Sequence, residues 1–325
     1  MPASHPLPLH IDSTMISCFR SCPQKFYLEF CGGFRPPGLS IDLHAGACFA
    51  SALETVYRCV WTKGMSLPDA LTVAHGHFMV LWGDFEIPEW KETAKTKDRV
   101  WEAVEDYFVH YSPKTDHIQP YFTPSGEPTF EYTFAIPLEP TCDPSDTNRR
   151  YGHAFPLHPS GSPFLYCGRL DMLGSYSGKP VGRDEKTTGR TPGQDWSKKW
   201  DFRSQFIGYT WALREAGIDA DTIVCRGVGI LKTKFHFPEA IKVYSDFDRA
   251  RWLEQLRRDL WRIRRSWDEG YFDFNIADTC TQYGICPFLD SCKSPNPETW
   301  LGAMEVRHWN PLNKNPAKEP QNVAA

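Results

Sequence analysis

The residues whose types and spacing could carry chemistry lie between positions 168 and 188. Asp171 falls in a strand-like run, and Asp184 and Lys186 follow on the apparent return strand. Since side chains alternate faces along a strand, Asp184 and Lys186 point the same way and Glu185 the other. A hairpin of this size can bring Asp171 opposite that pair. Two adjacent acids repel unless a cation separates them, so the pattern predicts a Mg²⁺ site suited to phosphodiester cleavage.

A solvated hairpin is the alternative interpretation of the same residues. Exposed ion pairs contribute only about 0–1 kcal/mol, and Arg169 or Arg183 could simply pair with these acids. A short motif of this kind is a hypothesis that needs support from the rest of the chain.

A second candidate site is formed by cysteines near the C-terminal end. Cys280, Cys286 and Cys292 are separated by five residues each, and clustered thiolates are typical ligands of a soft metal centre. A closed four-sulfur site needs a fourth ligand, for which Cys22 is favoured because it lies beside a proline at a predicted helix break. Cys18, one helical turn earlier, is the alternative.

Both a [4Fe–4S] cluster and a structural Zn²⁺ ion accept four cysteines. The spacing differs from the close cysteine pairs of most zinc sites, which favours the cluster and leaves Zn²⁺ as the alternative. The remaining cysteines are expected to be buried thiols that pack as small apolar side chains. These are Cys31, Cys48, Cys59, Cys142, Cys167 and Cys225.

The elements that must position these residues can be read from apolar periodicity, which predicts an α/β fold. Helices are expected over 13–31, with a break at Cys22-Pro23, and over 42–62, 67–83, 96–112, 201–216 and 247–268. Strands are expected over 127–137, 164–175, 180–188, 221–231 and 238–244.

Composition is compatible with a nucleic-acid enzyme. The chain has 325 residues, a formal net charge of −4 and a pI of about 6.3, so any nucleic-acid contact needs a local basic stripe. Candidates are Lys198 and Lys199 near the acids, and Arg257, Arg258 and Arg262 on the helix expected over 247–268. A solvated helix face is the alternative for those arginines.

The first twenty residues lack the apolar region of a signal peptide, and no run of about 18 apolar residues occurs. Eleven cysteines without a secretory signal indicate a reducing compartment, in which metal binding is favoured over disulfides. We therefore expect a cytoplasmic protein, in a bacterium or a phage-infected host cell, with no membrane association.

Together these segments resemble the iron–sulfur branch of the PD-(D/E)XK nuclease superfamily, which includes RecB- and AddB-type nuclease domains, CRISPR adaptation exonucleases and phage exonucleases. Residues 19–28 resemble its opening F-x-x-C-P-x-x-F-Y-L motif, and residues 168–186 its G-x-x-D…D-x-K core. Gln205 and Tyr209 resemble its Q-x-x-x-Y helix motif, and the last three cysteines its cluster loop.

The resemblance implies a metal-dependent DNA exonuclease with a restriction-endonuclease-like core, a mixed sheet flanked by helices. Asp171, Asp184 and the backbone carbonyl of Glu185 would hold Mg²⁺ or Mn²⁺. Lys186 would orient the attacking hydroxide or neutralise the transition state. Single- or double-stranded DNA ends would be the substrate, and a recombination or replication protein a possible partner.

The resemblance also implies supporting roles. Gln205 and Tyr209 would orient Lys186 or grip a phosphate. Where many members carry a metal-binding histidine on an early helix, this chain has Ala50, and Glu54 on the same helix face could reach the metal instead. Glu131 is either a further acid near the site or an outward-facing strand residue.

The expected organisation has five parts: a flexible N-terminus over 1–12, a helical part over 13–120, a nuclease core over 121–270, a cysteine loop over 271–308 and a disordered tail over 309–325. A metal cluster would clip the cysteine loop to the N-terminal helices. Alternative functions are a catalytically impaired DNA-binding module, prompted by Ala50, a CRISPR spacer-processing nuclease, and a redox protein that uses the cluster.

Overall fold

The computed structural model describes residues 4–38, 40–88, 91–139, 154–193, 195–276, 278–281 and 284–313. These residues form two compact units. The sheet unit comprises residues 39–133 and 169–249, and the terminal unit comprises residues 1–38, 134–168 and 250–325. Three elements pass from one unit into the other: β4 (Phe130–Pro137), β5 (Leu165–Tyr176) and α7 (Asp246–Glu269).

The sheet unit is built around a mixed β-sheet. Within it β5 pairs antiparallel with β3 and β6, β6 pairs parallel with β7, and β7 pairs antiparallel with β8 and β9. The strands are β3 (Ile118–Pro120), β6 (Lys179–Thr188), β7 (Thr222–Ile230), β8 (Phe235–His236) and β9 (Glu239–Val243).

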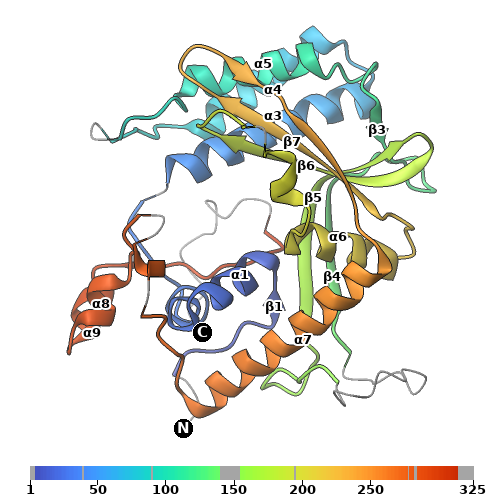
Figure 1. Cartoon of the computed structure of the whole chain (residues 1–325). Helices are drawn as coiled ribbons and strands as arrows, with labels where there is room; N and C mark the ends of the chain where they lie inside the picture. The colour runs from blue at the N-terminus through green and yellow to red at the C-terminus, as the bar shows by residue number, and fades with distance from the viewer. Residues whose placement is uncertain are drawn as a thin grey trace. The chain divides into compact units, whose positions relative to one another are not determined.

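Helices cover both faces of this sheet. Figure 1 shows α3 (Ile41–Lys63), α4 (Leu67–Trp82) and α5 (Lys97–His110) on one face and α6 (Ser204–Glu215) on the other. Their limits follow from local chemistry: the Ser66 and Thr96 side chains cap α4 and α5, and Gly64 ends α3 with a left-handed φ of 66°. The buried face of α3, α4 and α5 packs on apolar side chains of the sheet in one continuous core.

The terminal unit begins with the predicted split helix. It contains α1 (Ser13–Ser21), α2 (Pro23–Phe26) and a π-helical turn, η1 (Tyr27–Cys31), with the break at Cys22 and Pro23 in the first turn of α2. Among its described residues the unit also contains most of α7 and five short elements. These are β1 (His10–Ile11), β2 (Phe34–Arg35), α8 (Leu289–Lys293), α9 (Pro297–Leu301) and β10 (Glu305–Val306), with a 3₁₀ turn, η4, over Asp278–Cys280.

The predicted α/β class, a mixed central sheet flanked by helices, is confirmed, and every helix and strand expected from periodicity is present within a few residues. The elements that the sequence did not predict are short, such as β1, β2 and β10, because two residues show no alternation. The helix expected over 201–216 begins only at Ser204, because a separate 3₁₀ turn, η3 (Ser197–Trp200), precedes it.

The two chain ends also make defined contacts in the terminal unit. His10 and Ile11 pair parallel with β5, and the indole of Trp309 donates a hydrogen bond of 2.8 Å to Asp12. The remainder of the expected tail, residues 314–325, lies outside the described residues. Across the described ranges, every helix is too short or too polar to cross a membrane.

Gly227 on β7 provides a test of how the sheet is packed beside Lys186, its register partner. A Cβ atom at Gly227 would approach the Trp196 ring and the Pro238 ring to 2.7 Å. We therefore expect Gly227→Ala to lower the free energy of unfolding by about 1–3 kcal/mol in a denaturant titration. Gly189→Ala is the matched control, since nothing lies within 4 Å of its Cβ position; equal destabilisation by both would contradict this packing.

Candidate active site

Asp184 and Lys186 lie on one face of β6, as predicted. The Lys186 Nζ is 2.5 Å from Asp184 Oδ2 and 6.0 Å from the ring centroid of Phe206 on α6. The Asp184 side chain is 2% exposed, whereas that of Lys186 is 31% exposed. The carboxylate is therefore enclosed, and the ammonium group reaches solvent from the same point.

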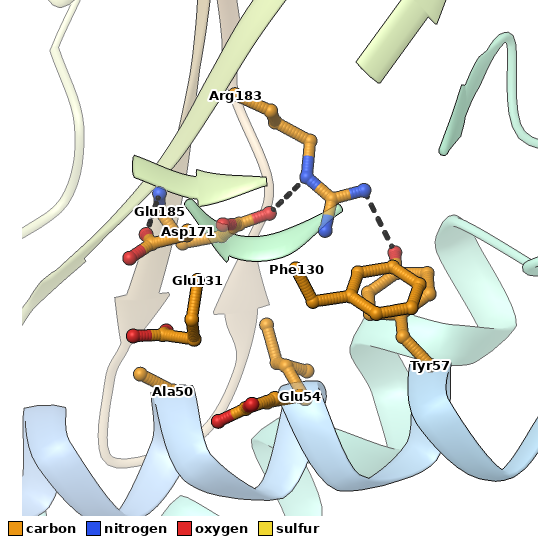
Figure 2. Close-up of a pocket in the computed structure, with 9 residues that line it drawn as sticks. Ala50, Glu54, Tyr57, Phe130, Glu131, Asp171, Arg183 and Glu185 are labelled. Carbon is orange, nitrogen blue, oxygen red and sulfur yellow. Dashed lines mark hydrogen bonds and ion pairs between the residues drawn. The ribbon is translucent and has the colours of Figure 1, made fainter. Parts of the chain in front are cut away.

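Asp171 lies where β5 and β6 separate. The two strands pair from the hairpin turn as far as Met172 and Arg183, and Asp171 is the next residue along β5. Its Oδ2 accepts a hydrogen bond of 2.7 Å from the backbone N–H of Glu185 (Figure 2). The hairpin thus brings Asp171 beside the Asp184–Lys186 segment, as the spacing predicted.

The electrostatics of the two acids show an unbalanced negative charge. Burial, followed by the charges of Asp184, Glu185 and Glu131, raises the pKa of Asp171 well above its usual range. Burial also raises the pKa of Asp184, although the Lys186 ammonium acts in the opposite direction. Because Glu185 and Glu131 are paired with Arg183 and Arg169, the single ammonium of Lys186 is left to offset both Asp171 and Asp184, and an additional cation would balance them.

A small cavity of about 10 Å³ adjoins Asp171, close to the volume needed for one water molecule. Figure 2 shows the acid side chains that line it, from Asp171, Glu185, Glu131 and Glu54, with Ala50 on α3 at its floor. Glu54 and Ala50 share one helix face, as predicted.

Glu131 occupies the space between the strands and α3 in this cavity (Figure 2). Its backbone is left-handed, with φ of 53°, and its carboxylate is 2.6 Å from Arg169 Nε. Of the two interpretations of Glu131, the position near the site is the one observed. Glu54 in turn is 2.6 Å from Arg58 Nε, so both additional acids already contact a cation.

We call the place where β5 and β6 separate the fork. The carboxylates there are the kind of ligand that a hard divalent cation prefers. Carboxylates crowd a partly enclosed space, and two of them have pKa values raised by burial. In the described part of the chain, however, no three His, Cys, Asp or Glu side chains are close enough together to hold a metal ion. Ion binding would therefore draw the carboxylates inward.

Gln205 and Tyr209 face the same side of α6 and contact each other. Gln205 Nε2 donates to the Tyr209 hydroxyl at 2.8 Å, and that hydroxyl donates to the backbone carbonyl of Arg169 at 2.7 Å. The pair is thus attached to β5 two residues before Asp171. This contact fixes the backbone that carries an acid, and the expected roles toward Lys186 or a phosphate stay predictions.

The candidate cluster cysteines lie in the terminal unit. Backbone hydrogen bonds from Gln24 to Asp273 and from Cys286 to Cys280, of 3.0 and 2.8 Å, tie the C-terminal loop to the helix break and fold it on itself. Burial raises the pKa of Cys292 to about 11, with further contributions from Cys286, Cys22 and Cys280.

Cys22, Cys280 and Cys286 thus lie near enough to Cys292 to act on its charge, but no three cysteines of the described residues are close enough together to hold a metal ion. Burial raises the pKa of the alternative, Cys18, to about 12, and the charges of Cys22 and Cys286 contribute to the increase, so Cys18 also lies near these cysteines. The cysteines expected to be buried thiols are buried at positions 31, 48, 59, 167 and 225. Cys142 lies outside the described residues.

The arginines expected to form a DNA-binding stripe on α7 are balanced by acids of the same helix. Arg257 is buried and bonds Glu254, which also holds Arg258 at 2.6 Å. Arg262 lies 3.8 Å from Asp259. Arg257 was expected on an exposed DNA-binding stripe, and its burial corrects that expectation. The helical periodicity did not show that Glu254 and Asp259 pair with these arginines.

The other basic candidates, Lys198 and Lys199, are exposed on η3 in the same unit as the acids. Lys198 pairs with Asp195 at 2.9 Å, and Lys199 lies 5.9 Å from the ring centroid of Trp196. Arg203 follows them and lowers the pKa of Asp184 through its charge. These three basic side chains are exposed and precede α6 in the chain.

Sequence reasoning missed a set of buried polar residues on the opposite face of β6. Arg226 is fully buried and bonds Asp116 and Glu239. The signal that could have found it is an arginine inside the apolar run of β7, where an unpaired charge would be very costly.

Asp171 provides a stability test that does not depend on catalysis. Because its pKa is raised in the folded protein, the carboxyl contributes stability at low pH that is lost as the pH rises above about 4. We expect Asp171→Asn, measured in EDTA at pH 7, to raise the free energy of unfolding by about 1 kcal/mol, with no gain at pH 3. A loss of stability at pH 7 would contradict the crowding of charge at the fork.

The chain is similar to solved structures of low sequence identity. A protein from Eubacterium rectale named "Putative exonuclease" has 12% identity and a TM-score of 0.48, covering 85% of this chain and 88% of its own. The protein SSO0001 has 12% identity and a TM-score of 0.30, covering 77% and 84%. No curated protein sequence matches significantly. The profile of the PD-(D/E)XK nuclease superfamily matches residues 13–293, so the chain belongs to that superfamily.

Proposed function

We propose that this nuclease is a Mg²⁺- or Mn²⁺-dependent deoxyribonuclease that hydrolyses phosphodiester bonds from DNA ends. The observation that supports the proposal best is the convergence of Asp171, Asp184 and Lys186 where β5 and β6 separate. Crowded acids beside one partly exposed ammonium match the needs of a bound metal ion and an anionic phosphate.

In this proposal Asp171, Asp184 and the backbone carbonyl of Glu185 hold the metal ion. When bound, Mg²⁺ or Mn²⁺ supplies a polarised phosphoryl oxygen and a water of lowered pKa. Lys186 positions the attacking oxygen or offsets negative charge in the transition state, because its three donors lie beside Asp184 and reach solvent. Glu54 and Glu131 complete the negative lining of the cavity.

We propose that the DNA strand passes along three exposed basic side chains of the sheet unit. Lys198, Lys199 and Arg203 are exposed and precede α6, the helix that faces Lys186. Arginine and lysine contacts to phosphate position a strand without reading its sequence. The preference for DNA ends rests on the family resemblance, as do roles in recombination, repair or replication, or in spacer processing, in a bacterial or phage-infected cell.

We further propose that Cys22, Cys280, Cys286 and Cys292 hold a structural [4Fe–4S] cluster, with Zn²⁺ as the alternative. The hydrogen bonds between the helix break and the C-terminal loop, together with the effect of Cys286, Cys22 and Cys280 on the charge of Cys292, support this assignment. Closing so long a loop would restrict the unfolded chain, as a disulfide does.

A DNA-binding module without cleavage is the second candidate function. The observation that favours it is Ala50, which contributes no ligand atom to the cavity at a helix position facing the acids. This alternative predicts DNA binding that is independent of Mg²⁺ and unaffected by loss of Asp184.

The proposed nuclease is tested by cleavage of 5′- and 3′-labelled single- and double-stranded DNA with Mg²⁺, Mn²⁺ or EDTA. We expect Asp184→Ala to slow cleavage by at least about 10²-fold, since it removes a metal ligand at the reacting centre. Asp106→Ala removes an exposed carboxylate of the same unit, on α5, and is expected to cleave normally. Retained DNA binding with no cleavage by the unmodified protein would favour the binding module instead.

The cluster assignment is tested by iron, zinc and sulfide analysis of anaerobically purified protein. We expect Cys286→Ser to lose most of its iron and brown colour and to lower the free energy of unfolding by about 2–5 kcal/mol, the range known for lost disulfides. Cys18→Ser is the matched control and should retain its iron. Iron loss in the Cys18 variant alone would assign the fourth ligand to Cys18, and zinc in place of iron would support the alternative metal.

A further inference from the structure

The face of β6 opposite Asp184 and Lys186 carries an unusual pair of buried charges. Arg183 Nε lies 2.7 Å from Glu185 Oε1, and both side chains are 3% exposed or less. The guanidinium also donates to the Tyr57 hydroxyl at 3.1 Å and lies 4.5 Å from the centroid of that ring (Figure 2). The residue between the proposed metal ligand and the lysine is therefore held by its own set of partners.

A second buried arginine lies beside this pair on β7. Arg226 is the register partner of Glu185 and donates two hydrogen bonds of 2.7 Å to the two oxygens of Asp116. It also donates to Glu239 at 2.8 Å, and its guanidinium lies 3.7 Å from the centroid of the Tyr111 ring. A bidentate arginine–carboxylate pair fixes orientation as well as position.

The hydroxyl group of Tyr107 connects Arg226 to Glu185, the partner of Arg183. That hydroxyl donates to Glu185 Oε1 at 2.7 Å and accepts from Arg226 NH1 at 3.2 Å. The chain of contacts thus runs from Asp116 through Arg226 and Tyr107 to Glu185, and every member has a side chain that is nearly inaccessible to solvent.

Stability alone is a weak explanation for such a network. The desolvation of buried charges offsets much of their attraction, and apolar side chains of similar volume are often equally stabilising. A network of this kind does, however, restrict the position of each member. Its end member is Glu185, whose backbone N–H donates to Asp171 and whose carbonyl belongs to the proposed metal site.

We propose that Tyr107 and Arg226 are positioning residues for the metal site: through the Glu185 side chain they fix the peptide between Asp184 and Lys186. The Glu185 amide then holds Asp171 at the fork, and the carbonyl keeps a fixed direction. This inference rests on the proposed metal-dependent function, and it assigns to residues of α5 and β7 the position of the peptide between Asp184 and Lys186.

The test compares two variants that each remove one buried hydroxyl. Tyr107→Phe breaks the link between Arg226 and Glu185, whereas Tyr111→Phe removes a hydroxyl that donates to the Phe237 carbonyl at 3.0 Å and does not reach Glu185. Mn²⁺ affinity is measured by calorimetry, without DNA, beside the thermal midpoint in EDTA. The Mg²⁺ dependence of DNA cleavage is measured in parallel.

We expect Tyr107→Phe to weaken Mn²⁺ binding by about 10-fold, the lower end of the effect of losing a group that orients metal ligands. Tyr111→Phe should remain within about twofold of the unmodified protein, although both variants lose similar thermal stability. The concentration of Mg²⁺ that gives half-maximal cleavage should rise in the Tyr107 variant alone.

Equal Mn²⁺ affinity in the two variants would overturn the inference and leave the network a structural feature. Mn²⁺ binding that weakens in Tyr107→Phe, in a protein that cleaves no DNA, would support the positioning role while overturning the nuclease proposal. An unmodified protein that binds no Mn²⁺ would overturn both.

Discussion

Mutual repulsion of carboxylates at the fork of β5 and β6 is the constraint on which the rest of the sheet unit depends. Asp171 and Asp184 cannot both remain ionised and enclosed without a nearby cation, and Lys186 supplies only one. The surrounding structure opposes the repulsion by attaching the backbone at several points. The amide of Glu185 holds Asp171, and the Tyr209 hydroxyl holds the carbonyl of Arg169. A site under this constraint is prepared for a divalent ion.

The two faces of β6 carry different sets of residues: the proposed reacting groups on one and the side chains that hold the strand on the other. One face presents Asp184 and Lys186 toward α6, and the other inserts Arg183 and Glu185 among tyrosines of α3 and α5. Because successive side chains alternate, the support lies one residue away from each group that it holds. The packing of the helices is thereby transmitted through the backbone of β6 to Asp184 and Lys186, the proposed reacting groups. Such backing is what an active site needs to keep its groups in fixed directions.

The sequence allowed the β5–β6 hairpin, the split N-terminal helix and most helices and strands to be predicted, because each has a strong local pattern. Side-chain alternation alone placed Asp184 with Lys186. The buried network could not be predicted, because Asp116 and Arg226 are far apart in the chain and meet only through tertiary packing. The prediction that Arg257 is exposed was wrong for a similar reason: the helical pattern suggested an exposed basic stripe, but the side chain is buried. Local periodicity reports which face a residue occupies, but not which acid will meet it there.

The most direct measurement of the central claim is a crystal structure of the protein grown with Mn²⁺, with anomalous differences recorded at the manganese edge. A Mn²⁺ peak bounded by the carboxylates of Asp171 and Asp184 and the carbonyl of Glu185, about 2.0–2.3 Å from its oxygen ligands, is the predicted result. A protein that shows full activity in Mn²⁺ but no anomalous peak at the fork, or a peak elsewhere, would contradict it.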